Sequence, residues 1–192
     1  MSETTYENEC EVTIEGIGKG ILLNNPSSMF DPQPGGLSKK HPTPEEDAAK
    51  KCYWTEDKKH LAFPGDNIWR GMINASTGAK LPSNKKMSLG PLVAGNTEIF
   101  PSMISFGTKK YEIDTRRAVV QRQGIPRSRP KLPTWSLTFR VGWDSGYLGK
   151  EFHETILPQL LDRLGHQIGI GDFRPEKKGP FGKFKVVKIK KI

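Results

Sequence analysis

The chain has 192 residues and a formal net charge of +9, from 30 Lys and Arg against 21 Asp and Glu. This length fits one domain, and a positive surplus of this size favours an anionic partner, either nucleic acid or an acidic protein surface. With 34% hydrophobic residues, 20 Gly and 15 Pro, we expect long loops around a modest core, and no segment is apolar for long enough to span a bilayer.

The two cysteines, Cys10 and Cys52, lack the close spacing that a zinc site or a disulfide framework requires, so we expect free thiols in a reducing compartment. The histidines are scattered, with no metal-ligand spacing. The acidic, polar N-terminus does not have the pattern of a signal peptide. We therefore expect a cytoplasmic protein without a metal or cofactor.

The first part of the chain predicts a strand and then a long insertion. Apolar and polar residues alternate from 9 to 15, which is typical of a strand with one buried face. Pro and Gly are frequent from 26 to 64, so we predict an exposed insertion there. Within it, we expect a short helix near 45–52 and a small hairpin at 53–63.

A helix is predicted to begin at Pro64-Gly65-Asp66-Asn67, because Asp66 or Asn67 can cap it and the apolar residues from 68 to 75 share one helical face. Gly78 and Pro82 close this helix. Residues 80–98 are expected to form a loop.

Three elements are then predicted in succession. A strand runs from Tyr111 to Gln123, and a basic connector covers 124–133. The clearest strand of the chain follows at 135–143, where Trp, Leu, Phe and Val alternate with small or polar residues.

The clearest helix spans about 149–165, with Leu and Ile on one face and Gly165 as the predicted C-cap. Pro158 predicts a kink or a later start. A Gly-rich loop over 169–183 leads into a final strand that alternates Lys with Val or Ile.

The predicted order is strand, helix, strand, strand, helix, strand. This order indicates an α+β protein with the ferredoxin-like (RRM-like) βαββαβ arrangement. We therefore expect one domain over 1–192 with long inserted loops, the largest at 26–64.

Two basic segments are the candidate nucleic-acid-binding surface. Residues 116–131 contain six basic side chains and no acidic one, and Arg suits phosphate because its fork donates two parallel hydrogen bonds. The Gly-rich loop adds further cations and aromatic rings, and its backbone is expected to lie close against a phosphate chain. Phe184 is expected in the core, whereas Phe173 and Phe181 are open between packing and base stacking. The predicted binding residues are Arg70, Arg116, Arg122, Arg127, Arg129, Lys131, Gly171, Phe173, Arg174, Lys177, Lys178, Gly179 and Lys183.

The Gly-rich phrase at 169–184 resembles the Gly-rich loop of the RAMP superfamily, the repeat-associated RNA-binding proteins of CRISPR systems. Phe63-Pro64-Gly65-Asp66-Asn67-Ile68-Trp69-Arg70-Gly71 is similar to the start of the first helix in the backbone subunits of CRISPR surveillance complexes. Arg127-Ser128-Arg129-Pro130, Trp135 and the phrase from Gly169 to Pro175 also resemble a compact family of phage and prophage proteins. The chain is shorter than the CRISPR subunits and has no room for their additional domain.

The resemblance implies a binder of single-stranded RNA or DNA that contacts the backbone without regard to sequence and assembles with copies of itself or with related subunits. It also implies a bacterial, archaeal or phage-infected host cell. One alternative is a RAMP-type endoribonuclease that uses a histidine such as His60 or His166. Another is a structural or adaptor protein whose basic surface meets an acidic partner.

Overall fold

The structure is a computed structural model that describes residues 6–26, 42–120 and 123–192, with backbone alone at 118–120 and 123–125. Helices and antiparallel strands form an α+β fold. The elements in chain order are β1 (Asn8–Ile17), β2 (Ile21–Leu22), α1 (Pro44–Ala49), β3 (Ala62–Pro64), α2 (Gly65–Ala75), β4 (Lys80–Leu81), β5 (Asn84–Ser88), α3 (Leu89–Asn96), β6 (Thr97–Phe100), β7 (Met103–Ser105), β8 (Glu112–Val120), β9 (Gln123–Leu132), β10 (Ser136–Trp143), α4 (Ser145–Leu148), α5 (Phe152–Arg163), a π-helical turn (Leu164–Ile168), a 3-10 turn (Pro175–Lys177) and β11 (Lys183–Lys191).

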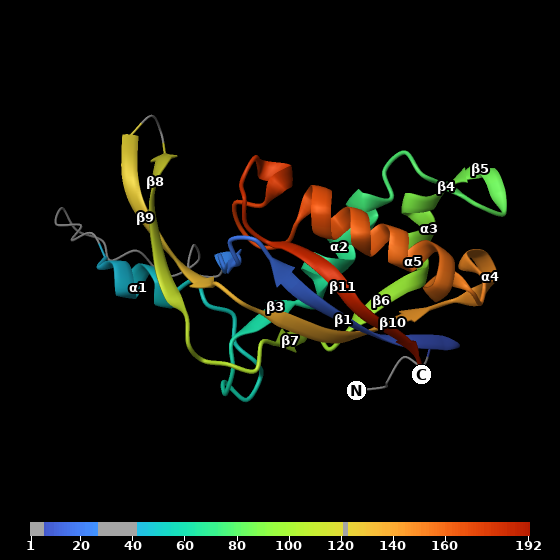
Figure 1. The fold of residues 1–192 in the computed structure, drawn as a ribbon, viewed down its shortest axis with the longest axis horizontal. Coiled ribbons are helices and arrows are strands. Elements are labelled where there is room, and N and C mark those ends of the chain that lie inside the picture. The colour runs from blue at the N-terminus through green and yellow to red at the C-terminus, as the bar shows by residue number, and fades with distance from the viewer. Residues whose placement is uncertain (1–5, 27–41, 121–122) are drawn as a thin grey trace.

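The main sheet has the strand order β11-β1-β10-β6, and every neighbouring pair is antiparallel. Alternating apolar residues of β1 and β10 point to one face, where Val12, Ile14 and Phe139 are almost fully buried. Helices α2 and α5 cover this face (Figure 1). The predictions of β1, α2, β10 and the final strand are therefore confirmed.

The opposite face of the main sheet is polar and carries matched charges. Glu15 lies 3.1 Å from Lys185, and Glu9 lies 2.9 Å from Arg140. Thr13 and Thr138 share a hydrogen bond of 3.0 Å across β1 and β10. Cross-strand pairs of this kind stabilise a solvated sheet face, and they leave little net charge on it.

A long β8–β9 hairpin stands to one side of the main sheet, next to α1 (Figure 1). The predicted connector at 124–133 is wrong, because these residues form β9. Pro126 and Pro130 misled the prediction, since Pro cannot donate to a strand ladder. The carbonyl of Pro130 accepts from the amide of Leu23, which follows β2, so Pro130 presents its backbone polar groups to the edge of β9 that faces away from β8. Pro126 has the same orientation because it lies four residues earlier in the strand. The N–H groups that the two prolines lack therefore cost no hydrogen bond between β8 and β9.

Helix α1 extends along that same edge of β9. The Asp47 carboxylate accepts from the amide of Ser128 at 2.7 Å, and the Lys51 ammonium donates to the Ser128 carbonyl at 2.7 Å. Thr43 begins the helix with a capping box that includes Glu46. The predicted short helix is confirmed, and the Trp54–Leu61 bridge confirms the small hairpin.

The expected loop at 80–98 is also wrong, since it contains the β4–β5 hairpin and α3. Gly90, Pro91 and Gly95 are poor helix formers, which conceals α3 in the sequence. Leu89 and Val93 are buried in the core beside α2. Tertiary packing therefore stabilises a helix that intrinsic propensity does not favour.

The predicted helix at about 149–165 corresponds to α5, and the short helix α4 lies before it. Helix α5 begins at Phe152, later than predicted, and holds Pro158 in its interior. The predicted C-cap at Gly165 is wrong, because the chain continues through a π-helical turn to Gly169, which has a φ of 72°. Gly165 serves close packing instead: a Cβ there would lie 2.3 Å from the carbonyl oxygen of Phe184. No helix in the described ranges is long and apolar enough to cross a membrane.

Candidate nucleic-acid interface

The Gly-rich loop connects the π-helical turn to β11 and is joined by hydrogen bonds to the chain around β2. The amide of Gly182 donates to the Gly20 carbonyl at 2.8 Å, and that of Asp172 donates to the Leu22 carbonyl at 2.9 Å. Gly171 and Gly182 have φ values of 78° and 71°, a conformation that other residues adopt at a cost. The loop is thus fixed at the base of the hairpin.

Most backbone amides of this loop already have acceptors inside the fold. Donors within the loop are the amides of Gly169, Ile170, Asp172, Phe173, Lys177, Lys178, Gly179, Phe181 and Gly182. A bound phosphate would therefore meet side chains of the loop more readily than a cluster of free amides. Gly179 is buried, and a Cβ there would lie 1.8 Å from the Phe173 carbonyl oxygen.

Two arginines face each other at the centre of the hairpin. Arg116 on β8 is the cross-strand partner of Arg127 on β9. Asp114 accepts from Arg116 at 2.5 and 3.0 Å and raises the pKa of the Arg116 guanidinium, whereas Arg127 has no ion-pair partner among the described residues. Like charges directly opposite each other in a sheet are destabilising, so this pair favours an additional anion.

Arg116 also connects the hairpin to the loop. Its guanidinium lies 4.8 Å from the ring centre of Phe181 and 5.7 Å from that of Phe173. Phe181 is 1% exposed and therefore belongs to the packing of the loop, and Phe184 is fully buried as expected. Phe173 is 37% exposed and has a φ of 49°, so its ring is presented to solvent from a left-handed backbone.

Several predicted binding cations have carboxylate partners. Arg129 forms an ion pair with Asp172, and Lys131 lies 2.9 Å from Glu112. Arg174 donates to Glu176 at 2.5 Å and to the Gly171 carbonyl at 3.1 Å. Of these contacts, the ion pair of Arg129 with Asp172 joins the hairpin to the loop, and the others lie within one of the two. The predicted cations without a described carboxylate partner are Arg70, Arg127, Lys177, Lys178 and Lys183. Arg122 lies outside the described residues.

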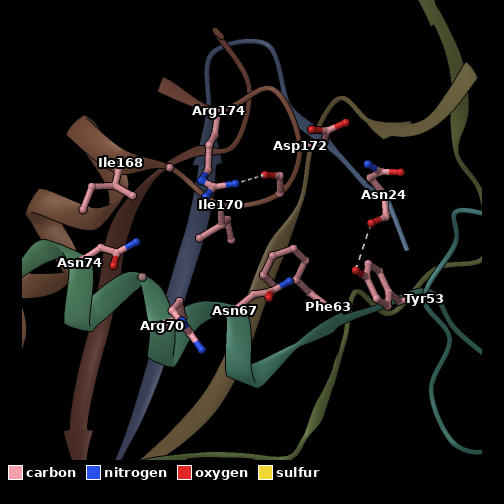
Figure 2. A pocket seen from close by; sticks show the side chains of 13 residues that line it. Asn24, Tyr53, Phe63, Asn67, Arg70, Asn74, Ile168, Ile170, Asp172 and Arg174 are labelled. Carbon is pink, nitrogen blue, oxygen red and sulfur yellow. Dashed lines mark hydrogen bonds between the residues drawn. The ribbon is translucent and has the colours of Figure 1, made fainter. Parts of the chain in front are cut away.

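A pocket of about 220 Å³ lies between α2 and the Gly-rich loop (Figure 2). Asn67, Arg70 and Asn74 line it from successive turns of α2. Gly71 permits the close approach of the helix, since a Cβ there would lie 2.6 Å from Leu164. The remaining lining residues are Asn24, Tyr53, Phe63, Ile168, Gly169, Ile170, Gly171, Asp172 and Arg174.

Arg70 is among the binding residues that the sequence predicts, but the pocket and its amides are not. The predicted cap at Asp66 or Asn67 is wrong, because α2 begins at Gly65 after Pro64 and both residues lie inside the helix. Asn74 carries no prediction. The positions of Asn67 and Asn74 with Arg70 follow the helical period, and that spacing is the signal that could have found them. Asn24 and Tyr53 come from distant segments, where the Tyr53 hydroxyl donates to the Asn24 carbonyl at 3.2 Å.

The described histidines, His60, His153 and His166, lie outside this pocket. The amide of His60 donates to Thr55 in the turn before β3, His166 is exposed beside Asp162, and the ring of His153 stacks on Trp143. Within the part of the chain that the structure describes, no three potential metal ligands come together.

The fold is similar to that of a chain in the cryo-EM structure of the Type III-B Cmr-beta bound to cognate target RNA. The TM-score is 0.54 at 13% sequence identity, and the match covers 96% of this chain and 61% of that chain. The protein therefore spans about three-fifths of that chain's length, and at this identity the likeness concerns the fold alone. No protein-family model and no curated protein match the sequence.

Proposed function

We propose that the main sheet with α2 and α5 is a ferredoxin-like core, and that the chain is a compact, phage or prophage relative of the RAMP superfamily. The strand order β11-β1-β10-β6 supports this proposal, because the elements β1, α2, β6, β10, α5 and β11 follow the βαββαβ order. The structural neighbour in the RNA-bound Cmr-beta is consistent with it. On this proposal, the β8–β9 hairpin and residues 26–64 are insertions in a single cytoplasmic domain.

We further propose that the protein binds single-stranded RNA or DNA through its backbone, without a strict sequence requirement. The observation that carries this proposal is the opposed pair Arg116 and Arg127. Among the described residues, Asp114 forms an ion pair with Arg116, whereas Asp47 interacts with Arg127 only at longer range. A phosphate placed between the two guanidiniums relieves their repulsion and accepts charge-assisted hydrogen bonds. Lys177 and Lys178 on the adjacent loop extend the cationic track.

Phe173 supports a single strand as the ligand. Its ring is exposed beside Arg116, and bases of a single strand have free faces that stack on aromatic rings. A duplex keeps its bases stacked on one another and offers no such face in its interior. We also propose self-association through the hairpin and the 26–64 insertion, because β8, β9 and α1 stand to one side of the main sheet (Figure 1).

The test is fluorescence anisotropy with labelled single-stranded RNA, single-stranded DNA and duplex over a salt series, with the mass of the complex recorded. Arg127→Glu is expected to weaken single-strand binding at least tenfold. It should also reduce the slope of log affinity against log salt concentration by the amount that corresponds to roughly one phosphate contact. The matched control is Arg117→Glu, because Arg117 is exposed on the other face of the same hairpin. Equal losses in both variants, or no binding of any strand at low salt, would contradict the proposal.

A further inference from the structure

The pocket between α2 and the Gly-rich loop is lined by polar side chains together with a smaller set of apolar ones. Phe63 and Ile170 are 1% and 2% exposed, and Ile168 is half-buried beside them. Figure 2 shows Asn67, Arg70 and Asn74 along α2 on one side, with the loop on the other. Pockets with apolar walls and a few convergent polar groups bind small organic rings.

The composition of this pocket does not suit a phosphate group by itself. The amides of Gly169 and Ile170 donate to carbonyls inside the fold, so they are not directed at the pocket as anion ligands. Arg174 is paired with Glu176, which leaves Arg70 as the uncompensated cation among the described lining residues. An anion placed against Phe63 and the isoleucines would lose hydration without sufficient compensation.

The amides of the lining suit the edge of a nucleobase. A carboxamide offers a donor and an acceptor side by side, which matches the hydrogen-bonding edge of a base. The Nδ2 atom of Asn74 donates to Glu176 at 3.3 Å, and this contact leaves its Oδ1 for a ligand. Asn67 contacts the Tyr53 hydroxyl, which orients its amide from the opposite end of the pocket.

We propose that this pocket holds one unstacked nucleobase of the bound strand, with its edge against Asn67 and Asn74 and its phosphate at Arg70. Contact with Phe63, Ile168 and Ile170 replaces part of the stacking that the base loses when it leaves its neighbours. This inference rests on the proposed single-strand binding and adds a base preference to it. The protein then selects one base at one position within an otherwise sequence-independent contact.

The experiment compares homopolymeric oligonucleotides of each base with an abasic oligonucleotide of the same length, in the same anisotropy assay. Wild-type protein is expected to prefer one base at least fivefold over the weakest and to bind the abasic strand more weakly still. The double variant Asn67→Ala/Asn74→Ala is expected to lose that preference and to keep the salt slope of the wild type. Gln159→Ala, which removes an exposed amide on α5, is expected to change neither quantity.

A second variant keeps the proposal testable if the double variant does not fold. Asn67→Asp is isosteric, and a carboxylate near the N-terminus of α2 suits the helix dipole, so this variant is expected to fold and to shift the base preference. Equal binding of base-bearing and abasic strands would overturn the base pocket while single-strand binding stands. Failure to bind every strand would overturn both. Tight binding of a free nucleoside monophosphate that is unaffected by Arg127→Glu would overturn the assignment of the base to a bound strand.

Discussion

The Asp47 carboxylate lies 2.8 Å from the Lys51 ammonium, and the two side chains together satisfy both backbone polar groups of Ser128 on β9. Only 12% and 10% of the respective side chains are exposed. The pair occupies the edge of β9 beyond β2, where a further strand would otherwise supply the same donor and acceptor. The insertion thereby fixes the hairpin that carries Arg127.

Removal of one partner from this pair is expected to destabilise the protein. In Asp47→Ala, the buried Lys51 ammonium keeps the Ser128 carbonyl but loses its counter-charge, and the Ser128 amide loses its acceptor. The loss should be about 3 kcal/mol in the free energy of unfolding. Urea unfolding measures it. Glu45→Ala in the same helix is the control, because Glu45 is exposed and has no comparable contact among the described residues. A loss of the same size in both variants would contradict a special role for the pair.

The same pair predicts an acid dependence of stability. Burial would raise the pKa of Asp47, but the hydrogen bonds from Lys51 and from the Ser128 amide outweigh it and hold this pKa below the ordinary value. The resulting stabilisation is complete above the unfolded pKa of about 4 and is lost as the pH falls through the lower folded pKa. Between about pH 6 and about pH 3, Asp47→Ala should therefore lose less stability than the wild type. An identical decline in the two proteins would show that Asp47 does not titrate with folding.

Phe173→Asn separates a binding role of the ring from a structural one. Asn adopts the left-handed conformation more readily than Phe, so the stability of the fold should change by less than about 1 kcal/mol. Affinity for a single strand should fall by about tenfold, because the stacking surface is lost. Lys58→Asn is the matched control, since Lys58 has a φ of 55° and lies in the turn between β-bridge residues Trp54 and Leu61. Retention of full affinity in Phe173→Asn would exclude stacking on this ring.

Replacement of a glycine by Ala should lower the stability of the protein at one position in a helical segment and raise it at another. Gly165→Ala places a methyl group against the Phe184 carbonyl oxygen and should cost about 2 kcal/mol. Gly95→Ala in α3 meets no atom within 4 Å, and it should add about 0.5–1 kcal/mol through helix propensity. Thermal or urea unfolding of both variants measures the difference. A loss of stability in Gly95→Ala would mean that α3 is not helical in solution.

The elements that the sequence predicted correctly are those whose periodicity reflects burial against the main sheet. Leu137, Phe139 and Val141 alternate because β10 has one buried face, and the same reasoning found β1. Strand β9 and helix α3 escaped prediction because Pro and Gly indicate breaks in isolation. Strand β9 is stabilised because α1 satisfies its otherwise unpaired edge, and α3 is stabilised by its packing against α2. Neither partner can be recognised from the local sequence.

The sequence predicts which residue types make up the candidate site, but not how their side chains pair. The sequence located the basic segments and Phe173, but the ion pair of Arg129 with Asp172 joins two segments that are distant in the chain. The pocket likewise takes Tyr53 from the insertion, Asn67 from α2 and Gly171 from the loop. Such contacts depend on the completed fold, so residue type and spacing alone do not reveal which cations remain unpaired.

The lysines of β11 restrict how copies of this chain can meet. Strand β11 is the outermost strand of the main sheet, and Lys185, Lys188 and Lys190 are exposed along it. A second strand that approached this edge in the same orientation would bring ammonium groups together, which opposes continuous sheet growth between molecules. In the self-association proposed above, copies of the chain would therefore join through surfaces other than this edge, and the β11 margin would lie free along the outside of the array.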